Sequence, residues 1–177
     1  NDEWQEIRLD IDADAKPDIV GTMLDMSAVD DASMDAIYSS HNIEHVYAHQ
    51  VPIMLGEFKR VLKPDGFLVV TCPDLQSVCA LVAEGKLLET AYESPAGPIS
   101  PLDILYGHRA SLAGGNEYMA HKCGFTEEVL RAILPQYGFA RAGTVSRPHP
   151  YYDLWAVATV ADVTYDALRT LATQHFP

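Results

Sequence analysis

One stretch of the chain, residues 35–74, has the pattern of a strand, a helix and a second strand in close succession. We predict a strand at Asp35–Ser39 and another at Phe67–Cys72, which is almost wholly apolar, as expected of a strand buried on both faces. Between them, Gln50–Lys63 carries apolar side chains at helical spacing, namely Val51, Met54, Leu55, Phe58 and Leu62. A strand–helix–strand unit of this length favours a right-handed crossover and a parallel sheet.

Polar side chains follow both of these predicted strands. Those after the first strand are Ser39, Ser40, His41, Asn42 and Glu44, and those after the second are Pro73 and Asp74. In an open α/β sheet, ligands bind outside the carboxyl ends of the parallel strands. The sequence therefore predicts a binding site at this edge, with Asp74 also placed to cap the helix that follows.

The remaining regular elements suit one α/β domain over residues 1–177. We predict two early strands, a helix that begins after the N-cap Thr126, two final strands as an antiparallel edge pair and a C-terminal helix. Their ranges are Glu6–Asp12, Asp18–Met23, Thr126–Tyr137, Phe139–Ser146, Leu154–Val160 and Asp166–Gln174.

Residues 84–120 interrupt this pattern with many glycines and prolines. A connection of this length is uncommon in a compact domain and is usually a lid or a binding loop. We therefore expect an inserted lid that recognises substrate, with Tyr106, His108, Arg109 and Tyr118 as the contacting residues. Arg109 could pair with a carboxylate or phosphate group.

The overall composition narrows the function classes. The chain of 177 residues has a formal net charge of −13, which argues against nucleic acid as a partner. No apolar run is long enough for a membrane span, and the start NDEWQEIRLD does not resemble a signal peptide. The three cysteines lack paired spacing and are expected as free thiols, so we expect a cytoplasmic protein; homo-oligomerisation stays open.

Two motifs together resemble the class I S-adenosylmethionine-dependent methyltransferases. They are Glu44-His45 after one strand and the helix end Arg60-Val61-Leu62-Lys63-Pro64-Asp65-Gly66. The resemblance covers roughly residues 6–74 well and the segment around Thr126 and Gly138 less closely. It implies a Rossmann-like, doubly wound α/β fold with a mostly parallel sheet and an antiparallel edge strand.

The resemblance also implies a cofactor site for S-adenosylmethionine. Asp10 would accept hydrogen bonds from the ribose hydroxyls, as a carboxylate can from two vicinal groups. Asp25 and Met26 would contact the adenine, and His41 would lie beside the methionine part of the cofactor. His41 is our first candidate for a general base in methyl transfer and His121 is the second.

One element of that family has no counterpart in the chain. The family begins with a strand and a Gly-rich turn before the acidic strand, whereas the first glycine here is Gly21. We expect a further N-terminal piece that supplies this turn. The alternative is a methyltransferase-like module that has lost cofactor binding and serves in binding or assembly.

A third interpretation comes from His41-Asn42-Ile43-Glu44-His45, which matches the H-x-x-E-H pattern of some zinc peptidases. His49 would extend it to three histidines on one face if the segment were helical. The motif follows a strand directly and shows no third ligand, so a zinc hydrolase stays an alternative and no metal site is assigned. The main expectation is methyl transfer to a small-molecule acceptor.

Overall fold

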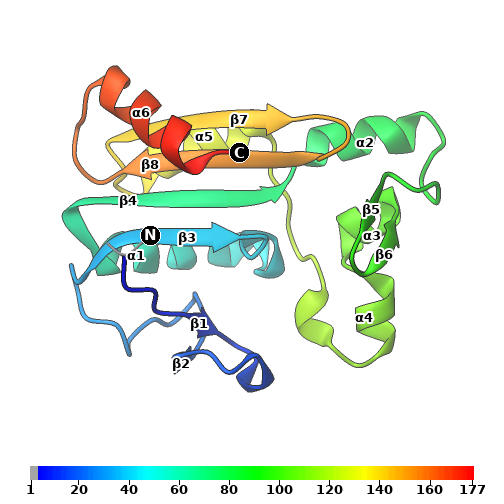
Figure 1. Cartoon of the computed structure of the whole chain (residues 1–177), viewed down its shortest axis with the longest axis horizontal. Helices are drawn as coiled ribbons and strands as arrows, with labels where there is room; N and C mark the ends of the chain where they lie inside the picture. The colour runs from blue at the N-terminus through cyan, green and yellow to red at the C-terminus, as the bar shows by residue number, and fades with distance from the viewer. Residues whose placement is uncertain (1–3) are drawn as a thin grey trace.

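The computed structural model describes residues 4–177, and its centre is a four-stranded sheet in the order β3-β4-β8-β7 (Figure 1). The strands are β3 (Met34–Ser40), β4 (Leu62–Pro73), β7 (Arg141–Arg147) and β8 (Asp153–Thr159). Within this sheet β3 and β4 pair in parallel, while β8 is antiparallel to both of its neighbours. The expectation of a mostly parallel sheet was therefore wrong, because the inner strand of the C-terminal hairpin lies beside β4.

Helices cover both faces of this sheet, as a doubly wound α/β fold requires (Figure 1). On one face lie α1 (Val51–Val61) and α5 (Glu127–Gln136), and on the other lies α6 (Tyr165–His175). Alternate residues of β4 point to opposite faces of the sheet. Leu68 packs in the larger core with α1 and α5, and Val69 packs with Leu168 of α6.

The predicted crossover from β3 through α1 to β4 is confirmed, with one difference at its end. α1 stops at Val61, whereas the helix was predicted to reach Lys63. The motif residues Pro64–Gly66 lie inside the range of β4, where the pairing with β3 shifts register. A Cβ atom at Gly66 would lie 3.0 Å from the carbonyl oxygen of Asp35. The close approach of the two backbones at this bulge therefore favours glycine.

The N-terminal strands are much shorter than predicted. β1 (Leu9–Asp10) and β2 (Ile19–Val20) pair only with each other, in parallel, and form a two-stranded ribbon outside the central sheet. Ile7 and Ile11 are 45% and 47% exposed, so the alternation that predicted a long strand does not bury its apolar side. After β1, Asp12 caps a 3₁₀ turn by accepting a hydrogen bond from the backbone N–H of Asp14.

The segment predicted as a lid contains secondary structure of its own. After α2 (Leu75–Ala83), the chain forms a hairpin, two short helices and a 3₁₀ turn: β5 (Tyr92–Ser94), β6 (Gly97–Ile99), α3 (Pro101–Tyr106), α4 (Arg109–Ala113) and η4 (Glu117–Met119). We call residues 92–121 the insertion. It lies beyond the carboxyl ends of β3 and β4 (Figure 1).

Two predicted helix caps are confirmed at the borders of the insertion. Asp74 accepts a hydrogen bond from the backbone N–H of Gln76 at the start of α2, and Thr126 accepts one from Val129 at the start of α5. The predicted C-terminal helix is present as α6. The three cysteines are free, and within residues 4–177 no helix has the length and apolar character to cross a bilayer.

Candidate functional site

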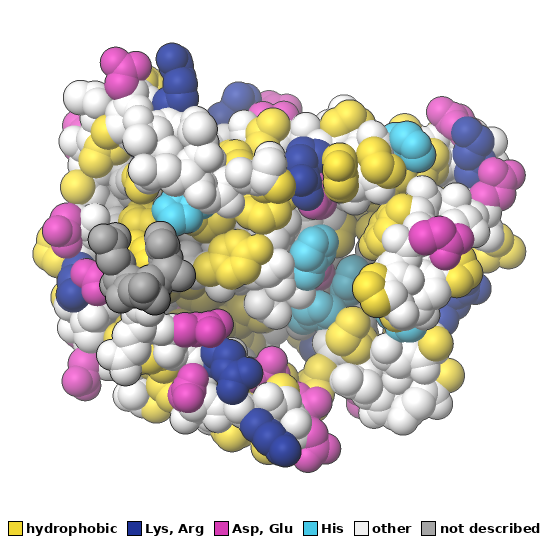
Figure 2. Space-filling model, viewed as in Figure 1, with side chains coloured by type: hydrophobic (Ala, Val, Ile, Leu, Met, Phe, Trp, Pro, Cys, Tyr) yellow, Lys and Arg dark blue, Asp and Glu magenta, His cyan; other side chains and the backbone are white. Residues whose placement is uncertain are grey.

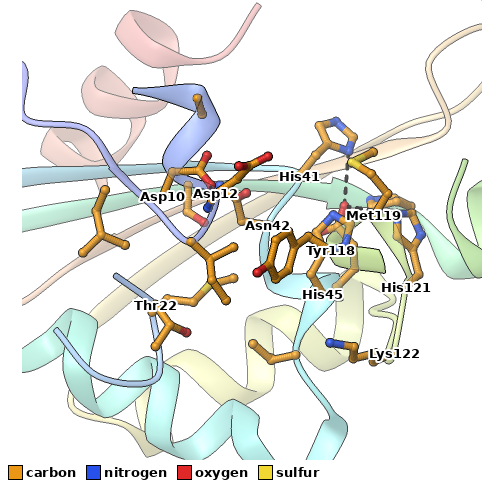
Figure 3. A pocket seen from close by; sticks show the side chains of 18 of the residues that line it. Asp10, Asp12, Thr22, His41, Asn42, His45, Tyr118, Met119, His121 and Lys122 are labelled. Atoms are coloured by element: carbon orange, nitrogen blue, oxygen red, sulfur yellow. Dashed lines mark hydrogen bonds and ion pairs between the residues drawn. The ribbon is translucent and has the colours of Figure 1, made fainter. Parts of the chain in front are cut away.

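A cavity of about 830 Å³ lies where the β1–β2 ribbon, the carboxyl end of β3 and the insertion meet (Figure 3). This volume is typical of small-molecule and cofactor sites. Six of the sequence-predicted site residues line it: Asp10, Met26, His41, His108, Tyr118 and His121. The expected position at the strand ends is therefore the position of this cavity.

Three predicted site residues do not line this cavity. Asp25 lies at a separate shallow depression, where its carboxylate accepts a hydrogen bond from the backbone N–H of Ser27, and Ser27 lowers its pKa. Tyr106 points its ring largely into solvent. Arg109 forms a two-pronged ion pair with the buried carboxylate of Asp103, so its guanidinium is already engaged within the insertion.

The segment that carries Met26 is held by the ion pair between Glu57 and Arg60 of α1. From the sequence alone, such a pair three positions apart on a helix is expected to lie on a solvated face. Glu57 accepts the backbone N–H of Met26 at 2.7 Å, and Arg60 donates to the carbonyl oxygens of Met26 and Val29. Arg60 also pairs with Glu57 at 2.7 Å. Because this pair fixes the backbone beside the cavity, the arginine of the helix-end motif has a positioning role here.

His41 stands at the mouth of the cavity, directly after β3. Its backbone has a positive φ of 50°, and its N–H donates to the carbonyl oxygen of Thr71 in β4 at 2.8 Å. The Nδ1 atom lies 3.5 Å from Oε1 of Glu44. Burial lowers the pKa of His41, but the negative charge of the nearby Glu44 outweighs it, so the pKa is raised on balance.

Glu44 is the most buried charged side chain of the site, with 1% exposure. It lies in the 3₁₀ turn η2 (Ile43–His45), and its backbone carbonyl accepts the N–H groups of Lys122 and Cys123 at the end of the insertion. Within the described residues, neither carboxylate oxygen has a hydrogen-bond partner. A buried carboxylate without compensation is costly, so this one needs a positive charge or a proton nearby.

Two histidine side chains complete the surroundings of Glu44. Nδ1 of His45 lies 3.0 Å from the carbonyl oxygen of Ala120, and Nδ1 of His121 lies 2.7 Å from that of Ile104. Since a carbonyl only accepts, both rings carry their proton on Nδ1 there. Nε2 of His121 lies 4.0 Å from Oε1 of Glu44, and burial lowers the pKa of His121 despite that charge.

Figures 2 and 3 show histidine side chains gathered where the sheet meets the insertion, with His41, His45 and His121 turned toward one another. His49 is not among them, because it lies in a separate turn, η3 (Ala48–Gln50), and stacks on Tyr47. No helix aligns the three histidines of the H-x-x-E-H extension. His41 and His121 were predicted as site residues, whereas Glu44 and His45 were named only within their motifs and were assigned no catalytic or cofactor-binding role.

The residues present fit the cofactor that the sequence resemblance implies. Asp10 ends β1 beside the cavity with an exposed carboxylate, one oxygen of which accepts the N–H of Asp12 at 2.8 Å. The thioether of Met26 is buried against the same space. Ser39 lines the cavity at the end of β3, and within the described residues its buried hydroxyl has no hydrogen-bond partner. Such a hydroxyl is available to a ligand.

Comparison with known proteins finds a family model that matches part of the chain. Residues 6–70 match the model of a methyltransferase domain. A search of curated proteins finds no match. These findings and the fold confirm the resemblance to class I S-adenosylmethionine-dependent methyltransferases.

Three solved structures illustrate the likeness in fold. An S-adenosylmethionine-dependent methyltransferase from Thermotoga maritima, described as a possible histamine N-methyltransferase, is 18% identical with a TM-score of 0.52, over 80% of this chain and 62% of that one. An S-adenosylmethionine-dependent methyltransferase from Archaeoglobus fulgidus is 15% identical with a TM-score of 0.54, over 85% of this chain and 74% of that one. The 1,6-didemethyltoxoflavin-N1-methyltransferase of Burkholderia thailandensis has 1,6-didemethyltoxoflavin and S-adenosylhomocysteine bound. It is 15% identical with a TM-score of 0.50, over 85% of this chain and 59% of that one. The chain thus spans less than two thirds of the first and third of these structures.

Proposed function

We propose that the protein transfers a methyl group from S-adenosylmethionine to a small-molecule acceptor. The observation that carries the proposal is the cavity of about 830 Å³ at the strand ends, which joins an acidic strand end to a histidine group within a methyltransferase fold. A small acceptor is supported by the Burkholderia thailandensis neighbour, which holds a small substrate together with S-adenosylhomocysteine.

In this proposal one side of the cavity binds the cofactor and the other side binds the acceptor. Asp10 accepts the ribose hydroxyls and Met26 packs on the adenine, whereas Asp25 is not retained because it lies outside the cavity. The sulfonium methyl of the cofactor is already activated when bound. The chain therefore has to align the two reactants and exclude water, which the surrounding ribbon and insertion can do.

The acceptor is proposed to bind on the insertion side, against His108 and Tyr118. Tyr106 and Arg109 are not retained, because the first is turned to solvent and the second is paired with Asp103. His41 would accept the acceptor proton if one has to leave, because it is half exposed at the cavity mouth and Glu44 stabilises its charged form.

Calorimetric titration of S-adenosylhomocysteine tests the cofactor assignment, with protein expressed from the complete coding sequence. We expect one site per chain, and about tenfold weaker binding or more for Asp10→Ala, since hydrogen bonds to a charged group contribute about 1.5–3 kcal/mol. Asp14→Ala is the matched control, because Asp14 is an acid of the same segment that does not line the cavity. Absence of binding to the intact protein would favour the non-catalytic binding module instead.

A second measurement tests the role of His41. If it is the general base, His41→Ala lowers kcat for the true acceptor by about 10²–10⁴-fold, with binding of S-adenosylhomocysteine retained. Unchanged turnover would remove His41 from the chemistry and leave only a positioning role.

A further inference from the structure

The buried carboxylate of Glu44 has no compensating hydrogen bond, although every other buried acid of the described chain has one or more. Asp74 accepts from Gln76, Ser77 and Ser146, and Asp103 and Asp153 each bind an arginine. Glu44 is 1% exposed, and within the described residues neither of its oxygens makes a hydrogen bond. Its Oε1 atom instead lies 3.5 Å from Nδ1 of His41 and 4.0 Å from Nε2 of His121. This difference indicates that a further group, which carries a positive charge or donates a hydrogen bond, compensates the carboxylate of Glu44.

The two histidines beside Glu44 are oriented as metal ligands usually are. Each directs Nδ1–H to a backbone carbonyl, His45 to Ala120 and His121 to Ile104. A hydrogen bond of this kind from the outer ring nitrogen fixes the tautomer and leaves the lone pair of Nε2 for a cation. The rings meet edge to face with their centroids 4.9 Å apart, so both free nitrogens border the same space.

The three side chains offer ligand atoms that all lie within 4.8 Å of one another. Around a tetrahedral ion with bonds of about 2.0–2.1 Å, neighbouring ligand atoms are about 3.4 Å apart. Small rotations of the side chains suffice to close that difference. We infer that Glu44, His45 and His121 bind a divalent transition-metal ion at the inner end of the cavity.

The ligand types narrow the metal. Two neutral imidazoles with one carboxylate suit zinc and the neighbouring first-row ions better than Ca²⁺ or Mg²⁺, which prefer oxygen. Three protein ligands leave one position open toward the cavity, the arrangement of reactive rather than structural sites. The site differs from the H-x-x-E-H zinc-peptidase pattern, because Glu44 is a ligand here and the third ligand, His121, comes from the far end of the insertion.

Such an ion would also bind and activate the methyl acceptor; this extension rests on the proposed function. A hydroxyl bound at the open position has its pKa lowered by the metal, so it can lose its proton near neutral pH and attack the methyl group as an oxyanion. The bond formed would be acceptor oxygen to methyl carbon, the bond broken would be methyl carbon to sulfur, and the proton would pass to solvent. The acceptor class would then be a small molecule with a hydroxyl group.

The test is metal binding by tag-free protein that has been stripped of metal, measured without cofactor or acceptor. We expect Zn²⁺ titration to give one ion per chain and to raise Tm by about 5 °C at saturating Zn²⁺. Glu44→Gln, which preserves shape and removes the charge, should weaken Zn²⁺ binding at least about tenfold and abolish the rise in Tm. His121→Asn removes Nε2 but keeps a donor for the carbonyl of Ile104, and should do the same.

His49→Ala is the matched control, because His49 is a nearby exposed histidine outside the cluster and should bind Zn²⁺ like the unmodified protein. Co²⁺ should give an absorption spectrum of a four-coordinate ion that Glu44→Gln loses. Equal Zn²⁺ binding by Glu44→Gln or His121→Asn, or no binding by the unmodified protein, would overturn the inference and leave a protonated histidine as the compensating charge. Binding of S-adenosylhomocysteine is measured separately, so failure of one proposal leaves the other standing.

Discussion

The sheet body and the insertion meet at the cavity, but they are held together by different forces. The body buries a continuous apolar core from β3, β4 and β8 with α1 and α5. The insertion contributes Ile99 and Ile104 to a smaller apolar cluster that it shares with Val78 of α2 and Tyr152. It also relies on hydrogen bonds and special backbone geometry. Burial is non-directional, whereas hydrogen bonds fix orientation. The body therefore supplies stability, and the insertion supplies the position of side chains such as His121.

The strongest test of this difference is a cavity in the body. Phe139 is 1% exposed within the main core, so Phe139→Ala should lower the free energy of unfolding by about 3–5 kcal/mol. The measurement is urea unfolding followed by the fluorescence of Trp155 in β8. Leu88→Ala, at an exposed position, should change the value by no more than about 0.5 kcal/mol. A loss below about 1 kcal/mol for Phe139→Ala would contradict the assignment of stability to this core.

Backbone geometry in the insertion gives the second prediction. Gly107 has a φ of 99°, and a Cβ atom there would lie 2.0 Å from the carbonyl oxygen of Met119, so Gly107→Ala must displace one of the two segments. We expect a local cost of about 1–3 kcal/mol or more. Amide hydrogen exchange should rise in residues 101–121 and stay unchanged in the sheet body.

Gly97 provides a matched control for this substitution. Its φ of 105° is also left-handed, but a Cβ atom there would meet nothing within 4 Å. Gly97→Ala should therefore show only the smaller penalty of a positive φ. Equal effects at the two positions would mean that strain alone, and not the contact with Met119, decides the outcome.

The same difference explains what the sequence could predict. The helix α1, the strand at Phe67–Cys72 and the caps Asp74 and Thr126 follow from local spacing and local hydrogen bonds, and all are present. The parallel pairing of β3 with β4 was likewise predicted from the length of the crossover. These elements depend on neighbours in sequence or on burial of a regular apolar pattern.

The parts that were missed depend on contacts between distant residues. Glu44 and His121 are 77 positions apart by their numbers, and nothing local in either segment shows that the insertion returns to η2. Arg60 resembles an ordinary helix-surface arginine until Met26, 34 positions earlier, is found to accept its hydrogen bond. The short β1 and β2 differ from prediction because alternation gives the shape of a strand but not its pairing partners.

The smallest predicted effect is the dependence of the insertion on acid. Asp103 is buried and its pKa lies well below the usual range, chiefly because Arg109 donates hydrogen bonds to it; burial acts in the opposite direction. A carboxylate with a lowered folded pKa stabilises the fold fully above its unfolded pKa of about 3.9 and loses that contribution as pH falls toward the folded value. Because Arg109 is more than half exposed, we discount the effect to about 1–2 kcal/mol.

Titration from pH 7 to pH 3, followed by the backbone amide NMR signals of the insertion, measures this contribution. The signals of Leu105 and Gly107 should change below about pH 4, while those of β4 and β8 hold. Asp103→Asn should show a weakened insertion already at pH 7 and no further change on acidification. If the Asn variant loses the insertion with the same acid profile as the unmodified protein, another group is responsible, and the polar network around Asp103 does not hold the insertion against the sheet body.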